Sequence, residues 1–133
     1  MKIAEDRLIE LLSEGDSWPA LGLGHLRSAK ALPALYALLD KCQEAMVVFI
    51  AYSIYQINQD AQMIDKVLKE LPKITSEYAL VDIQYYLGLF NEPPIKAELR
   101  KYRNDHRYLV AYNAARALGE STDDVVQEFH KKR

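Results

Sequence analysis

Residues 51–57 read Ala-Tyr-Ser-Ile-Tyr-Gln-Ile, residues 82–88 read Asp-Ile-Gln-Tyr-Tyr-Leu-Gly, and residues 113–119 read Asn-Ala-Ala-Arg-Ala-Leu-Gly. The three stretches follow one another at intervals of 31 residues, and each lies within a longer apolar segment. A fixed interval of this length is typical of helical repeat proteins, in which each repeat buries its apolar face against the next. We therefore expect mostly buried helices over about residues 44–58, 76–90 and 105–119.

A more amphipathic segment precedes each apolar one, and its marker positions keep nearly the same step: Leu32, Ile64, Ile95 and Val126. Pro93 sits where a helix can begin, and Ser121 and Asp124 predict a capping box before the last helix. We expect Leu68 and Leu118 to be buried between repeats. The alternation predicts an all-α single domain with repeats at about 1–28, 29–59, 60–91 and 92–120 and a final half repeat at 121–133. An ordinary helical bundle with coincidental spacing is the alternative.

Composition limits the classes of protein to which the chain can belong. Half of its 133 residues are hydrophobic, so it can bury a sizeable core, and its net charge is only −2. Its one cysteine, Cys42, cannot build a disulfide framework. The longest uncharged stretch, 45–59, is shorter than the roughly 20 residues that a membrane-spanning helix needs. We expect a cytoplasmic protein without a membrane segment.

Two segments resemble a known family. Residues 18–39, Trp-Pro-Ala-Leu-Gly-Leu-Gly-His-Leu-Arg-Ser-Ala-Lys-Ala-Leu-Pro-Ala-Leu-Tyr-Ala-Leu-Leu, and residues 114–120, Ala-Ala-Arg-Ala-Leu-Gly-Glu, are similar to the short HEAT-like repeats named after phycobilin lyases. The resemblance spans about residues 16–133 and implies an α-α superhelix, a short right-handed solenoid of helix pairs. The chain departs from the family where an arginine often precedes the second helix's apolar core; those positions hold Phe49, Leu80 and Ala111.

No motif in the chain indicates a catalytic, metal or cofactor site. None of the three histidines, His25, His106 and His130, has a second histidine three or four residues away. Cys42 has acidic neighbours, which disfavour a reactive thiolate. Gly22 and Gly24 lack the rest of a dinucleotide fingerprint, so we expect them to allow close helix packing or a helix break. We expect no catalytic residue, no cofactor, no metal and no enzymatic activity.

Tyrosine and one carboxylate provide the candidate binding residues. Seven of the nine tyrosines lie on the three apolar helices, and we expect Tyr52, Tyr78 and Tyr112 to pack between layers. Asp82 interrupts its apolar helix, so it either pairs with Asn113 or Arg116 on the next helix or lines a ligand groove. In the resembling family the second helices line the concave surface. The predicted partner-binding residues are Tyr55, Asp82, Tyr85, Tyr86 and Arg116, with Tyr55 and Tyr86 stacked one repeat apart.

These features favour a module that binds a protein partner through its concave helices, as an adaptor, a scaffold or a toxin-neutralising immunity-type inhibitor. The alternative is a nucleic-acid-binding module similar to HEAT-like DNA-repair glycosylases. Residues 94–133 hold 9 basic and 6 acidic residues, and residues 96–107 alone contribute five cations beside Tyr102. The overall acidic balance favours a solvated face over phosphate binding. A bilin lyase-like enzyme is a third possibility that rests on the resemblance alone.

Overall fold

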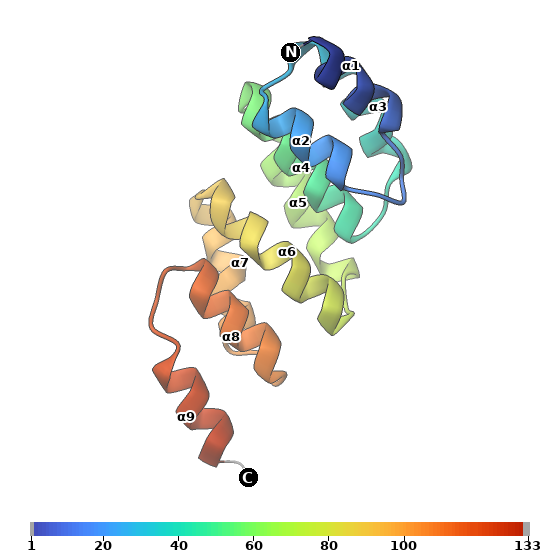
Figure 1. The fold of residues 1–133 in the computed structure, drawn as a ribbon. Coiled ribbons are helices and arrows are strands. Elements are labelled where there is room, and N and C mark those ends of the chain that lie inside the picture. The colour runs from blue at the N-terminus through green and yellow to red at the C-terminus, as the bar shows by residue number, and fades with distance from the viewer. Residues whose placement is uncertain (1, 132–133) are drawn as a thin grey trace. The chain divides into compact units, whose positions relative to one another are not determined.

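The computed structural model describes residues 2–131, and it places most of them in α-helices (Figure 1). These are α1 (Lys2–Leu11), α2 (Trp18–His25), α3 (Leu32–Lys41), α4 (Ala45–Asn58), α5 (Gln62–Glu70), α6 (Glu77–Phe90), α7 (Pro93–Arg103), α8 (Tyr108–Ala117) and α9 (Asp123–Lys131), with 3-10 turns η1 (Ala29–Ala31) and η2 (Leu71–Lys73). Within the described range the extended pairing is limited to one isolated bridge, between Ser13 and Asp16. The all-α prediction is confirmed, and the three apolar helices begin and end within three residues of their expected limits.

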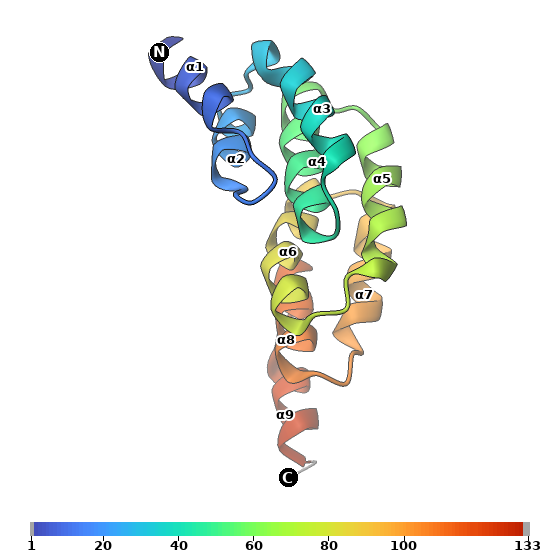
Figure 2. The same ribbon diagram turned by 90° about the vertical axis from the view of Figure 1, so that its right-hand side faces the viewer.

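The chain divides into two compact units, Met1–Lys73 and Ile74–Arg133. In the first unit α4 is the central helix, because α2, α3 and α5 all pack against it, while α1 packs on α2 (Figure 2). Val47, Ile50 and Ile54 of α4 are at most 1% exposed. A helix covered by three others must be apolar on most of its sides, which explains the composition of α4.

Close backbone contact and two buried polar groups hold the first unit together. A Cβ atom on Gly24 of α2 would lie 2.9 Å from the Cα of Ser53 in α4, so the expectation of close packing at this glycine is confirmed. The buried Glu70 carboxylate accepts a 2.8 Å hydrogen bond from the backbone N–H of Glu44, whose φ is +55°. That bond offsets the strain of a left-handed backbone at the start of α4.

In the second unit α8 is central, and α6, α7 and α9 pack against it. Here a Cβ atom on Gly88 of α6 would lie 2.7 Å from the carbonyl oxygen of Ala117 in α8. Leu99 of α7, Ile83 of α6 and Val110 of α8 are fully buried and form part of the core that these helices share. Among the described residues, no helix is long and apolar enough to cross a lipid bilayer.

Three local predictions from the sequence are wrong. Leu68 and Leu118 are half-buried rather than buried. The buried stripe of α5 runs through Met63 and Val67 and not through Leu68. Leu118 is the C-cap residue of α8, beyond the last residue of that helix. The capping box is not formed: the Ser121 hydroxyl accepts from the N–H of Asp123, two residues on, and the Asp124 carboxylate binds Arg103 instead. A strong guanidinium partner outcompetes a local capping bond.

Candidate protein-binding face

Helix α6 has one buried side and one exposed side, a difference that was not predicted from the sequence. Its buried positions are Leu80, Ile83, Gln84, Leu87 and Phe90, each at most 3% exposed. The opposite side carries Tyr78, Asp82, Tyr85 and Leu89, spaced i, i+4, i+7 and i+11, and all four are exposed. Tyr78 is 79% exposed and Tyr85 65% exposed, which is far from the packing between layers expected for Tyr78. Large apolar side chains that gather on one exposed side of a helix make that side a candidate binding surface.

Helix α8 extends this surface. Leu109 is 45% exposed and Arg116 is exposed, and both lie opposite the buried residues of α8. Helices α6 and α8 pack against each other and against α7, so their exposed sides lie away from these contacts. We call the six residues of these exposed sides the outer face: Tyr78, Asp82, Tyr85 and Leu89 of α6, and Leu109 and Arg116 of α8.

The structure places three of the five predicted partner-binding residues, Asp82, Tyr85 and Arg116, on the outer face. Tyr86 is half-buried beside it and meets the Tyr85 ring edge-to-face, with centroids 5.2 Å apart. Tyr55 is also half-buried, but it belongs to α4 in the first unit. Tyr78, Leu89 and Leu109 were not among the predicted binding residues. Tyr78 and Leu89 could have been predicted from their helical spacing relative to Asp82, because residues at such intervals share one side of a helix.

The polar link between α6 and α8 is made by a different residue from the one expected. Among the described residues, no hydrogen bond or ion pair joins Asp82 to Asn113 or Arg116, and the Asn113 amide instead donates 2.8 Å to the carbonyl of Leu109 in its own helix. Gln84, fully buried, donates from Nε2 to the Val110 carbonyl at 3.0 Å. Asp82 therefore bears no burial cost, and the buried amide of Gln84 sets the register between the two helices.

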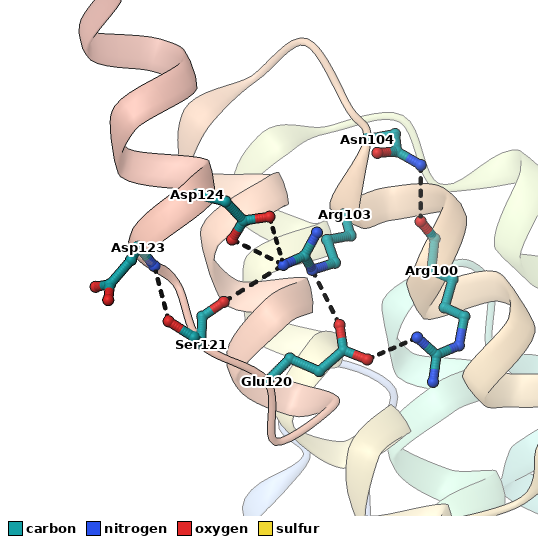
Figure 3. Close-up of polar contacts among 7 residues, drawn as sticks. All are labelled: Arg100, Arg103, Asn104, Glu120, Ser121, Asp123 and Asp124. Atoms are coloured by element: carbon teal, nitrogen blue, oxygen red, sulfur yellow. Dashed lines mark hydrogen bonds and ion pairs between the residues drawn. The ribbon is translucent and has the colours of Figure 1, made fainter.

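The basic segment of α7 is largely neutralised within the protein (Figure 3). Arg103 donates from Nη2 to both carboxylate oxygens of Asp124 at 2.8 Å, and its Nε lies 3.0 Å from Glu120 Oε1, close enough for an ion pair but poorly aligned for a hydrogen bond. Arg100 binds the other Glu120 oxygen at 2.6 Å. These contacts join α7 to the start of α9. The hydrogen bonds from Arg103 are the main cause that lowers the pKa of the Asp124 carboxyl from its ordinary value of 3.8.

Two further cations of this segment, Lys101 and Arg107, have similar partners. Lys101 pairs with Glu98 at 3.2 Å, and Arg107 binds Asp105 through Nε at 3.0 Å and through Nη2 at 3.1 Å. Arg107 also donates 2.6 Å to the carbonyl of Thr75, which ties the loop before α8 to the loop before α6. Four of the five basic residues in 96–107 therefore face carboxylates.

The Asp105–Arg107 pair predicts an acid-sensitive contribution to stability. Hydrogen bonding by Arg107 is the main cause that holds the pKa of the Asp105 carboxyl below its ordinary value of 3.8. A carboxyl with a lowered pKa in the folded state contributes stability that is fully present above its unfolded pKa and is lost as pH falls through the folded pKa. We expect Asp105→Asn to lower the unfolding free energy by about 1 kcal/mol at pH 7, and the difference from wild type to shrink below about pH 4. Urea titrations at pH 7 and pH 3 would measure this, and a constant difference would contradict it.

Two hollows lie elsewhere on the described surface. One of about 440 Å³ is lined mainly by the Arg103–Asp124 region, with Asn104, His106, Glu128 and Phe129. Another of about 460 Å³ lies beside Cys42 and Glu70 in the first unit. Burial, and after it the charge of Glu14, raises the pKa of the Cys42 thiol, which keeps it protonated at neutral pH. Among residues 2–131, no three His, Cys, Asp or Glu side chains converge as metal ligands.

Comparisons of the chain with protein-family models, with curated proteins and with solved structures found no match. The resemblance to HEAT-like repeats therefore remains a prediction from the sequence.

Proposed function

We propose that the protein is a non-enzymatic, cytoplasmic HEAT-like repeat module that binds a protein partner through α6 and α8, the second helices of its second unit, with the outer face as the contact surface. The observation that carries the proposal is the pair of exposed rings on one side of α6, Tyr78 at 79% and Tyr85 at 65%. Tyrosine supplies a large, stiff contact area with a hydrogen-bonding tip, and tyrosine and arginine are enriched among residues that dominate binding energy.

The packing within each unit supports the repeat interpretation. In the first unit α2 packs on α4, and in the second α6 packs on α8, as second helices of consecutive repeats would in a solenoid. Within each unit one glycine allows the close approach: Gly24 between α2 and α4, and Gly88 between α6 and α8. An adaptor or scaffold role and a toxin-neutralising immunity-type role both use such a face. The pairing of Arg100, Arg103 and Arg107 with carboxylates favours a protein partner over nucleic acid.

The test is affinity capture from the protein's own cells with wild type and with Tyr78→Ala/Tyr85→Ala, followed by measurement of the dissociation constant for the captured protein. We expect the double variant to weaken binding by roughly 2 kcal/mol or more, about 30-fold, because the two large aromatic anchors of the face are removed. Its helical circular dichroism should be unchanged, since both rings are exposed.

Trp18→Ala is the matched control. The exposed fraction of Trp18, 63%, is similar to the 65% of Tyr85. Trp18, however, lies on α2 in the first unit. Binding by this variant should equal that of wild type. Equal capture by wild type and by the double tyrosine variant would refute the proposed face.

A further inference from the structure

The outer face carries two opposite charges, Asp82 on α6 and Arg116 on α8. Asp82 and Arg116 are both exposed, and among residues 2–131 neither makes an ion pair. This contrasts with the other described arginines of the second unit, since Arg100, Arg103 and Arg107 all bind carboxylates. A cation and an anion beside exposed apolar side chains give this face charges of both signs, so it can be electrostatically complementary to a second surface that carries the same two charges.

The two charges lie on neighbouring helices that run in the same direction. Gln84 of α6 binds the carbonyl of Val110 in α8, and further along Gly88 contacts Ala117. Arg116 is therefore level with about residue 87 of α6, some five positions beyond Asp82, or about 7 Å along the helix. A flexible arginine side chain can span such an offset. A twofold axis can place α6 of one molecule over α8 of another. Asp82 on each α6 would then face Arg116 on the α8 of the other molecule, so the pair would form twice.

We propose that the outer face binds the same face of a second copy of this chain, with each Asp82 paired to Arg116 of the other copy. The inference rests on the proposed function, because it names the partner of the same face. The twofold contact would also cover Tyr78, Tyr85, Leu89 and Leu109, which are otherwise exposed to water. Self-complementary faces of this kind are the rule in homodimers, and twofold dimers are the commonest protein assemblies.

Sedimentation velocity over a concentration series tests the proposal with charge reversals. Wild type should reach twice the 15.3 kDa mass of the single chain. Asp82→Arg alone and Arg116→Asp alone should each raise the dissociation constant at least 10-fold, because each variant brings like charges together at both symmetric contacts. An equimolar mixture of the two variants should dimerise again, since the mixed dimer restores two opposite-charge pairs.

Lys69→Glu serves as the control, because Lys69 is exposed on α5 of the first unit and its reversal should leave dimerisation unchanged. A wild type that stays monomeric, or a dimer whose dissociation constant is insensitive to both reversals and to mixing, would overturn the second-copy proposal. If such a monomer still captured another protein through Tyr78 and Tyr85, the proposed function would stand and only this inference would fail.

Discussion

Replacing Leu99 with alanine is expected to lower the free energy of unfolding by about 2–5 kcal/mol. Leu99 lies on α7, which packs against both α6 and α8, and its side chain is fully buried. Alanine would remove three buried carbon atoms and leave a cavity, because the surrounding helices can close it only in part. Urea denaturation followed by circular dichroism would measure the loss, and the slope of the transition should stay near the wild-type value.

Leu109→Ala makes a matched comparison in the same unit. Leu109 is 45% exposed on α8, so the same truncation should cost well under 1 kcal/mol. Similar losses for the two variants would mean that Leu99 does not belong to the core of the second unit.

Gly88→Ala is expected to destabilise the protein by about 1–3 kcal/mol, although alanine normally favours a helix over glycine by up to about 1 kcal/mol. The added methyl group would lie 2.7 Å from the Ala117 carbonyl oxygen and 3.2 Å from the Ala117 Cβ. Both atoms belong to Ala117, the last residue of α8, so the methyl group can be accommodated only if α6 and α8 move apart. Thermal unfolding of the variant should show the loss as a lower midpoint.

Gly22→Ala provides the control for helix propensity. Gly22 is also inside a helix, but there an added methyl would meet only the tip of the flexible Leu8 side chain, at 3.2 Å. We expect this variant to be neutral or slightly stabilised. A stabilised Gly88→Ala protein would show that the close approach of α6 and α8 is not formed.

The helices could be predicted from the sequence because their determinants are local. Apolar periodicity marked α4 and α6 to within one residue, and Pro93 marked the start of α7. The candidate face was predicted only in part: Asp82, Tyr85 and Arg116 lie on it, whereas Tyr55 and Tyr86 are half-buried. Tyrosine is compatible with both core and surface, so its presence on an apolar helix does not reveal which side is covered.

The sequence by itself determined the all-α class, the positions of the three apolar helices and the 31-residue spacing between them, because these depend on which residues follow one another along a helix. The tertiary structure decided which sides of those helices are covered. Three helices cover α4, so Val47 and Ile54 are buried, whereas one side of α6 is left in water with Tyr78 and Tyr85 upon it. The structure also brought Arg103 to Asp124, 21 residues away. Coverage and long-range pairing depend on how distant segments pack, and a one-dimensional pattern does not contain that information.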